Sequence, residues 1–242
     1  MVQYKVLSTK KISPLLIEDA GKNNIQIIEQ EFISVKPITT KEKIEEILNL
    51  AKFEKKYVAF TSANAVTPFD TYLHQYDTHY VVGWQIFCLE GKTREAVQNS
   101  LLPKKNIICT AENARALSHK IIAYGVKEII FFCGNKRRND LPGILKDAGI
   151  NVHEVIVYET VEIPAMTSSD IDGILFFSPS AVNSFFTVNK LKSKTVCFAI
   201  GETTANSIVE FADNKIIIIE TPSQEMMLAS VNFYFQNINC YE

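Results

Sequence analysis

The sequence has no strong excess of charge of either sign. Its 25 lysines and arginines nearly balance 27 aspartates and glutamates, which leaves a formal net charge of −2. The basic clusters at 104–105 and 136–138 are too short to follow a phosphate backbone, because such binding needs an extended basic surface. We therefore expect no nucleic acid among its partners.

Long apolar segments are also missing. No run approaches the roughly 18 residues that a membrane-spanning helix needs, and residues 1–7 lead into a strand-like run rather than a signal peptide. The five cysteines form no Cys-x-x-Cys pair, and three of them end or interrupt apolar runs, as buried free thiols do. These absences predict a cytoplasmic protein with no membrane partner and no disulfides.

Familiar catalytic motifs are absent as well. The sequence contains no GxxxxGK[ST] phosphate loop, no GxGxxG after the first strand-like run, no GxSxG nucleophile elbow and no HExxH zinc motif. Its four histidines are not grouped with cysteines or carboxylates at metal-ligand spacing. We therefore expect neither nucleotide, metal nor catalytic-triad chemistry.

The sequence does contain many short apolar runs that are almost continuous rather than alternating, as strands buried on both faces are. These runs occupy residues 5–8, 57–62, 85–89, 106–110, 128–133, 173–178, 195–200 and 215–220. Helix-like stretches separate them, with start signals at Thr39 and Glu42 and at Thr221 and Pro222. Strands that alternate with helices predict an α/β protein with parallel sheets.

Two segments, 31–38 and 152–164, break this alternation because they are long and extended, and each contains a proline near its end. If they pair, they form connector strands between two domains. The sequence then predicts a discontinuous first domain, residues 1–30 plus 165–242, and a second domain, residues 39–151.

An internal repeat supports two related domains. Segment 59–66 aligns with 175–182, and segment 87–93 aligns with 197–203. Each half therefore carries a strand, a serine and a helix, followed by a strand, a glycine and another helix.

Small or hydroxyl-bearing residues follow the predicted strands, where an open parallel sheet has its ligand crevice. Helices begin at the same places, so backbone N–H groups there could bind anions. The simpler explanation, that these residues only cap helices, remains open. The residues concerned are Ser8, Thr9, Thr61, Ser62, Thr110, Gly134, Asn135, Ser178, Pro179, Ser180, Gly201, Thr203 and Thr204.

Tyr158 is the one side chain of the extended segments with a proton suited to acid catalysis, although tyrosines at such places more often serve packing. Arg137 and Arg138 follow Gly134 and could hold carboxylates, although a solvated run of charge is the commoner explanation.

An ordered set of segments spans nearly the whole chain and resembles the uroporphyrinogen-III synthase family. The set comprises 6–10, 60–66, 131–135 with Leu141 and Gly149, 155–160, 177–182 and 199–205. The resemblance implies two flavodoxin-like parallel-sheet domains, joined by a two-stranded β connector, with the active site in the cleft between them. It favours a monomer.

The resemblance also implies a function. The substrate would be hydroxymethylbilane, a linear tetrapyrrole with eight carboxylates, which a lyase without a cofactor closes to uroporphyrinogen III with ring D inverted. A transient contact with the preceding pathway enzyme would be compatible with this role. Tyr158 aligns with the tyrosine proposed in the family as the acid that assists departure of the substrate hydroxyl.

The predicted substrate contacts combine the strand-end residues with three further residues of the matching segments. These contacts are Thr9, Lys10, Thr61, Ser62, Ala63, Asn64, Gly134, Asn135, Ser178, Pro179, Ser180, Gly201, Thr203 and Thr204. The sequence departs from the family pattern at Lys10 and Cys133, where an arginine is common. Prolines 68 and 142 and Gly143 are expected to interrupt helices.

Two other functions remain compatible with the residues. The chain could be a two-domain sensor that closes on a small anion. It could also be a flavodoxin-like redox protein that holds a flavin at the hydroxyl-rich strand ends.

Overall fold

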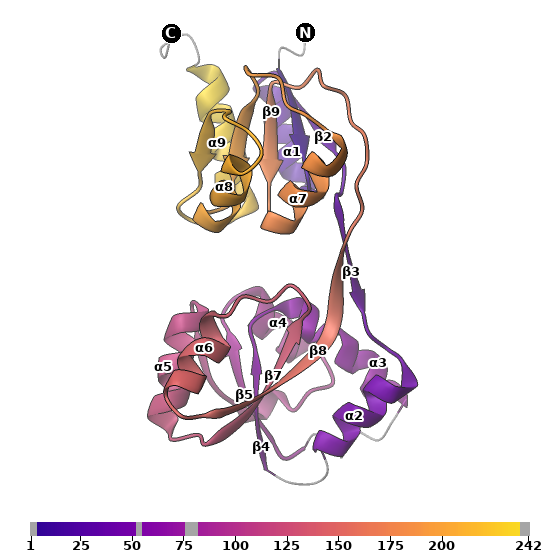
Figure 1. Ribbon diagram of the computed structural model, residues 1–242, viewed down its shortest axis with the longest axis vertical. Coiled ribbons are helices and arrows are strands. Elements are labelled where there is room, and N and C mark those ends of the chain that lie inside the picture. Colours follow the sequence, from indigo (N-terminus) through magenta and orange to yellow (C-terminus); the bar gives the residue numbers. More distant parts are fainter. Residues whose placement is uncertain (1–3, 52–54, 76–81, 238–242) are drawn as a thin grey trace. The chain divides into compact units, whose positions relative to one another are not determined.

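The computed structural model describes residues 4–51, 55–75 and 82–237. The chain divides into two compact units (Figure 1). Unit 1 comprises Met1–Ser34 and Val161–Glu242, and unit 2 comprises Val35–Thr160. The chain passes between them within the segments 31–38 and 152–164. The finer domain boundaries drawn from the sequence stay a prediction.

Unit 1 is a parallel sheet of five strands in the order β11-β10-β9-β1-β2. Numbered along the chain, this is the order 2-1-3-4-5 of flavodoxin-like folds. Helices α1 and α9 pack on one face, and α7 and α8 on the other. The elements are β1 (Tyr4–Ser8), α1 (Pro14–Lys22), β2 (Ile25–Glu29), β9 (Gly173–Phe176), α7 (Pro179–Val188), β10 (Val196–Ala199), α8 (Glu202–Val209), β11 (Ile216–Ile218) and α9 (Gln224–Gln236).

Strand β2 was not predicted from the sequence. It is an edge strand that pairs only with β1, so its polar residues Gln26 and Glu29 can reach solvent or the loop that follows β1. Indeed, the backbone N–H of Ile12 donates to the Glu29 carboxylate at 2.6 Å. Gln26 and Glu29 therefore interrupt the apolar run of β2, which lacks the continuous pattern of the buried strands.

Unit 2 contains six strands in the order β3-β8-β7-β4-β5-β6. Helices α5 and α6 pack on one face, and α2, α3 and α4 on the other. The elements are β3 (Ile33–Pro37), α2 (Lys41–Ala51), β4 (Lys56–Phe60), η1 (Ala63–Ala65), α3 (Thr67–Gln75), β5 (Trp84–Leu89), α4 (Lys92–Asn99), η3 (Lys104–Asn106), β6 (Ile107–Ala111), α5 (Ala114–Tyr124), β7 (Glu128–Gly134), α6 (Asp140–Asp147) and β8 (Asn151–Glu162).

The two long extended segments pair as β3 and β8. The N–H of Ile38 donates to the carbonyl of Val157 at 2.9 Å, and the N–H of Ile163 donates to the carbonyl of Phe32 at 2.9 Å. Because the two contacts run in opposite order along the strands, the pair is antiparallel. The predicted fold of two parallel-sheet units with a two-stranded connector is therefore confirmed.

The two sheets also share one plan. Strands β2-β1-β9-β10-β11 of unit 1 correspond to β8-β7-β4-β5-β6 of unit 2, with every neighbouring pair parallel. The corresponding strands are reached in a different order along the chain. Unit 1 starts with β1, whereas unit 2 starts with β4, the counterpart of β9, and reaches β7, the counterpart of β1, only later. The two units are therefore related by a circular permutation. The repeat seen in the sequence pairs β4 with β9 and β5 with β10, as this correspondence requires.

Aromatic packing fixes the strands of unit 2 near the candidate site. Phe132 of β7 stacks on Trp84 at a centroid distance of 5.3 Å and meets Phe69 of α3 edge-on at 4.8 Å. All three side chains are buried. Each such pair contributes about 0.5–1.5 kcal/mol beyond area burial, which keeps β5, β7 and α3 in a rigid arrangement.

Two predicted helix starts lie one or two residues from the observed ones. Thr40 rather than Thr39 caps α2, since its hydroxyl accepts from Lys43 N at 3.3 Å. Ser223 rather than Thr221 caps α9 and accepts from Met226 N at 3.1 Å.

The prolines predicted to interrupt helices do not do so. Pro68 and Pro142 lie in the first turns of α3 and α6, and Gly143 also lies within α6. The first N–H groups of a helix have no intrahelical acceptor, so a proline there costs no hydrogen bond.

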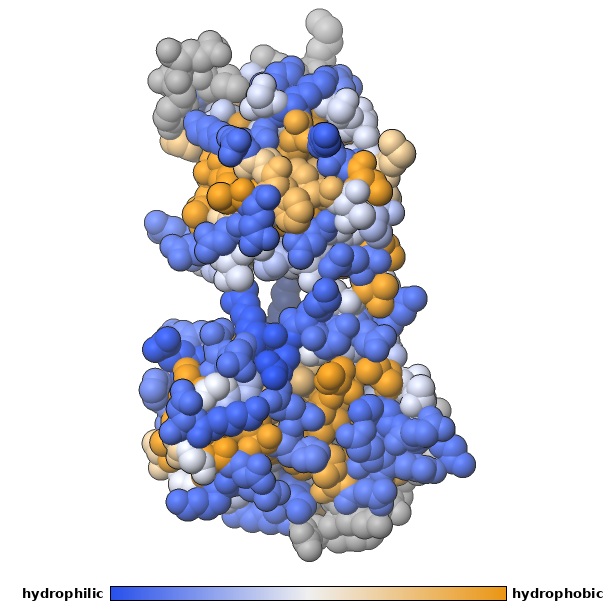
Figure 2. Space-filling model, viewed as in Figure 1, coloured by the Kyte–Doolittle hydropathy of each residue, from blue (hydrophilic) through white to orange (hydrophobic). Residues whose placement is uncertain are grey.

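The side of unit 1 that carries α7 and α8 has a surface rich in apolar side chains (Figure 2). Its exposed members include Val188, Val209 and Phe211, at the ends of the two helices. The carboxyl ends of these helices lie toward the amino ends of the unit 1 strands, which is the edge opposite the predicted strand-end contacts of the same unit, such as Ser178. None of the described helices is long and apolar enough to cross a membrane.

Candidate functional site

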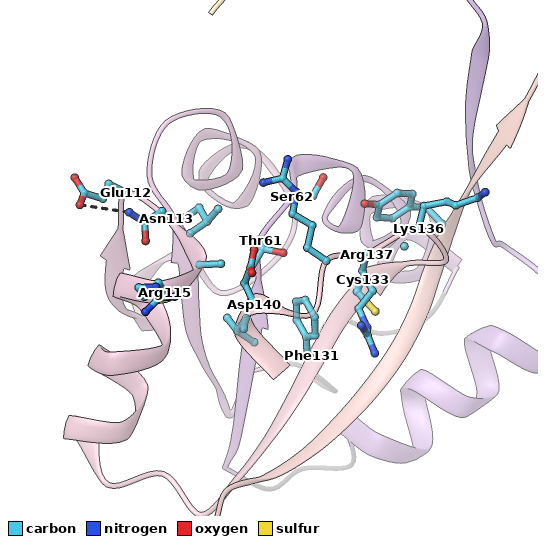
Figure 3. A pocket seen from close by; sticks show the side chains of 16 residues that line it. Thr61, Ser62, Glu112, Asn113, Arg115, Phe131, Cys133, Lys136, Arg137 and Asp140 are labelled. Carbon is cyan, nitrogen blue, oxygen red and sulfur yellow. Dashed lines mark hydrogen bonds between the residues drawn. The ribbon is translucent and has the colours of Figure 1, made fainter. Parts of the chain in front are cut away.

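A hollow of about 610 Å³ lies in unit 2 at the carboxyl ends of β4 and β7 (Figure 3). These strands are neighbours, but α3, which follows β4, and α6, which follows β7, pack on opposite faces of the sheet. Such a point is where open parallel sheets bind ligands. The lining residues are Thr61, Ser62, Leu89, Glu112, Asn113, Ala114, Arg115, Phe131, Cys133, Gly134, Lys136, Arg137, Arg138, Asp140, Leu141 and Tyr158.

Tyr158 reaches this hollow because of an irregularity in β8. Cys133 pairs with Ile156, but Gly134 pairs with Tyr158, so one residue of β8 is extra. Bulges of this kind change the direction of a side chain and are common beside active sites. The Tyr158 ring is partly buried against the unit 2 core, and no described residue forms a hydrogen bond with its hydroxyl.

Gly134 provides the space for this ring. A Cβ atom at residue 134 would overlap the ring of Tyr158 and would lie 2.8 Å from its hydroxyl oxygen. Only glycine therefore lets the tyrosine keep its present place. The two residues form one structural feature of the site.

Thr61 and Ser62 lie in the wall between Arg115 on one side and Lys136 and Arg137 on the other (Figure 3). The Ser62 hydroxyl accepts from Asn64 N at 3.2 Å and so caps the short helix η1. The sequence left this capping role open as an alternative. Ser62 is half-buried in the wall of the hollow.

Four cationic side chains and two carboxylates line the hollow, in a chain whose net charge is negative. Arg137 forms an ion pair with Glu154, and Lys146 donates to the same carboxylate at 2.7 Å. Burial by itself would raise the pKa of Glu154, but the hydrogen bonds from Lys146 and Arg137 outweigh it, and the pKa is lowered. Arg137 is therefore occupied within the protein.

The ion pairs of Glu154 should stabilise unit 2 at neutral pH. A lowered pKa stabilises the fold above the unfolded pKa, and this contribution is lost as the pH falls through the folded value. We expect Glu154→Gln to lower the free energy of unfolding by about 1 kcal/mol at pH 7, and the difference to shrink as the pH falls below the ordinary glutamate pKa and to vanish below the lowered pKa of the folded state. Urea unfolding across this range tests it, with exposed Glu159→Gln as the control. A pH-independent loss would contradict the electrostatic cause.

Cys133 lies in the hollow wall but is not a nucleophile. Its thiol is buried, and burial raises its pKa to about 11, even though Arg137 acts in the opposite direction. A thiol with such a pKa carries almost no thiolate at neutral pH. Among the described residues, Cys88, Cys109 and Cys197 are also free, and Cys240 lies outside them.

A family model described as uroporphyrinogen-III synthase HemD matches residues 15–229. The chain belongs to the uroporphyrinogen-III synthase family. No curated protein matches the sequence closely. The family assignment therefore depends on the family model and on the ordered motifs that agree with it.

Solved structures with this family name share the fold. A mutant uroporphyrinogen III synthase from Thermus thermophilus has 15% identity, a TM-score of 0.66, and coverage of 97% of this chain and 100% of that chain. Uroporphyrinogen-III synthetase from Helicobacter pylori 26695 has 16% identity, a TM-score of 0.67, and coverage of 95% and 98%. At this identity the likeness concerns the fold alone.

In this member of the uroporphyrinogen-III synthase family, three predicted contacts of unit 2 do not line the hollow. Ala63 and Asn64 form the turn η1 beside it. Asn135 connects β7 to β8, because its side-chain oxygen accepts from Thr160 N at 2.8 Å. Thr61, Ser62, Gly134 and Tyr158 are the predicted residues that the hollow brings together.

The other predicted contacts lie in unit 1. Thr9 is buried, and both its hydroxyl and its N–H donate to the Leu175 carbonyl. Ser178 caps α7 by accepting from Ala181 N at 3.2 Å, with Pro179 and Ser180 in the first turn. Lys10 and Thr203 are exposed, whereas Thr204 is buried and Gly201 precedes α8. Their roles as substrate contacts stay predictions.

Asn113 and Arg115 line the hollow but were not predicted from the sequence as candidate site residues. Asn113 caps α5, accepting from Ala116 N at 2.9 Å, and Arg115 lies in its first turn. A signal was present, since both follow a predicted strand at 106–110. Their proximity to residues 134–138 depends on the strand order, which local patterns do not contain.

Proposed function

We propose that this protein cyclises hydroxymethylbilane to uroporphyrinogen III, with inversion of ring D and loss of water, and so acts as a cyclising hydro-lyase. The observation that carries the proposal is the hollow at the β4 and β7 ends, where the Tyr158 phenol lies among cationic side chains. It supplies a proton donor and positive charge for a substrate with eight carboxylates. The membership of the family agrees with this chemistry.

In the reaction that the family resemblance implies, the terminal hydroxyl of the bilane leaves first. Tyr158 donates its phenolic proton to this oxygen, water departs, and the pyrrole nitrogen stabilises the resulting azafulvene cation. The substituted carbon of ring D then attacks it to form a spiro intermediate. Fragmentation and reclosure leave ring D inverted, and loss of a proton completes the ring, so that the net change is the loss of one water.

The remaining predicted contacts would hold the flexible substrate in a folded pose. We propose that backbone N–H groups at the helix starts beside Thr61, Ser62 and Ser178 receive carboxylates, and that the other predicted strand-end residues complete the contacts. We propose no cofactor, since the departing hydroxyl and the pyrrole nitrogen supply the driving force. Correct placement of the reacting carbons is then the main contribution of the protein.

We further propose that the protein works in the cytoplasm as a monomer, with only a transient contact to the enzyme that supplies the bilane. The buried free thiols Cys88, Cys133 and Cys197 support a reducing compartment.

The decisive experiment is a discontinuous assay with hydroxymethylbilane. After a short incubation, the products are oxidised and isomers I and III are separated by chromatography. We expect isomer III in excess over the isomer I that forms without enzyme. Isomer I alone would refute the proposal and favour the anion sensor, while a flavin spectrum of the purified protein would favour the redox protein.

The hydroxyls of the two repeated serines should matter little for turnover. We expect Ser62→Ala and Ser178→Ala each to reduce kcat by less than about tenfold, because a lost cap costs on the order of 1 kcal/mol while the N–H donors remain. The isomer assay measures this, with circular dichroism to confirm folding. Complete loss of activity in a folded variant would show that the hydroxyl itself takes part in the chemistry.

A further inference from the structure

The two units share one order of parallel strands, so the residues that follow corresponding strands can be matched between the units. Helix α5 of unit 2 corresponds to α9 of unit 1, because each follows the outermost strand of the shared plan. Each begins with a capping side chain, Asn113 in α5 and Ser223 in α9. The residues after these caps occupy equivalent places in the two units.

In unit 1, hydrogen bonds hold the first turn of α9 against the loop that follows β1. Gln224, the first residue of α9, donates from its side chain to the Lys11 carbonyl at 2.7 Å. Its side-chain oxygen accepts from Ser13 N at 3.2 Å. Helix α9 is therefore tied to the loop that follows β1, and the next residue is the acidic Glu225.

In unit 2 the equivalent place is open and basic. Ala114 stands where unit 1 has Gln224 and cannot make such bonds, and Arg115 stands where unit 1 has Glu225. Both residues line the hollow, as do Lys136, Arg137 and Arg138 from the loop that follows β7. The tie seen in unit 1 is thus replaced by a hollow between α5 and the loop that follows β7.

Two of these arginines have no anionic partner among the residues that the structure describes. Arg137 is paired with Glu154, but neither Arg115 nor Arg138 forms an ion pair with any residue that the structure describes. Both side chains are exposed. Arg115 also lies in the first turn of α5, where the helix dipole disfavours a cation; that turn contains no acidic residue, and Glu112 precedes the cap. A bound carboxylate would relieve this unfavourable electrostatic position.

We propose that Arg115 and Arg138 bind carboxylates of the tetrapyrrole, so that unit 2 provides the charged anchor for the substrate. The ligand identity in this inference rests on the proposed function. Guanidinium groups hold carboxylates through paired hydrogen bonds, which fixes orientation as well as position. Because these carboxylates do not react, the contacts strengthen ground state and transition state alike, and their loss raises KM while kcat is retained.

The test compares Arg115→Gln and Arg138→Gln with Arg94→Gln, which removes an exposed arginine of α4 outside the hollow. The readouts are kcat and KM for hydroxymethylbilane and the dissociation constant of uroporphyrin III, which carries eight carboxylates, measured by porphyrin fluorescence. We expect each hollow variant to raise KM and Kd about tenfold, and the double variant about a hundredfold, with kcat within about twofold. Arg94→Gln should change none of these values.

Arg115→Lys adds a further control, because it keeps the charge but loses the paired geometry, and we expect an intermediate Kd. Unchanged KM and Kd in both glutamine variants, in an enzyme that makes isomer III, would overturn the inference and leave the proposed function intact. A fall in kcat at constant KM would overturn it equally. If the unmodified protein makes no isomer III, the proposed function fails, while the uroporphyrin titration still tests the two arginines.

Discussion

Tyr158→Phe is expected to lower the rate of isomer III formation by about ten- to a hundredfold, with the fold and substrate binding retained. The phenol lies in the hollow with no hydrogen-bond partner among the described residues, so removing its oxygen leaves no buried partner unsatisfied. General acid assistance is typically worth about 10²–10⁴-fold. We expect the low end, because the pyrrole nitrogen expels the hydroxyl readily and placement of the chain carries much of the catalysis.

The measurement is the initial rate and isomer ratio in the chromatographic assay, together with the Kd of uroporphyrin III. Tyr124→Phe is the matched control, since Tyr124 is 48% exposed at the end of α5 and does not line the hollow. If Tyr158→Phe keeps full rate and full isomer III selectivity, Tyr158 serves packing only. The acid would then have to be sought in Thr203, Thr204 or a bound water.

Gly134→Ala should reduce activity at least as much as Tyr158→Phe. The added Cβ would overlap the Tyr158 ring, and the ring must leave its place because the backbone of β7 is held in the sheet. We expect a loss of about a hundredfold in kcat, because the proton donor is displaced. Overpacking of this kind also costs about 1–3 kcal/mol of stability.

A double-variant comparison separates the two effects. In the Tyr158→Phe background, Gly134→Ala should reduce kcat by a further factor of less than about three, because the hydroxyl that it would displace is already absent. In the Tyr158→Ala background, it should cost little stability, because the clashing ring is absent. Gly21→Ala is the control, since its Cβ would meet no atom within 4 Å. Wild-type activity in Gly134→Ala would show that Tyr158 needs no fixed position.

The sequence patterns predicted the fold best for those elements that depend on residues close together in the chain. The buried strands of both units were recognisable as short apolar runs, because a strand covered on both faces needs apolar residues at nearly every position. The caps Ser62 and Ser178 were recognisable as serines between a strand and a helix. Strand β2 was not predicted because the polar residues Gln26 and Glu29 interrupt its apolar run.

By itself, the sequence determined the α/β class, the strand-helix alternation, the paired connector segments and the family, since all of these depend on neighbouring residues or on ordered motifs. Only the tertiary structure decided which strand ends share one hollow. Arg115 and Arg138 line the same hollow although β6 and β7, after which they lie, are separated in the sheet by β4 and β5, and Tyr158 faces the hollow because one extra residue in β8 changes its register. Strand order and register depend on pairing between distant segments, and a one-residue shift redirects a side chain without any change in the sequence around it.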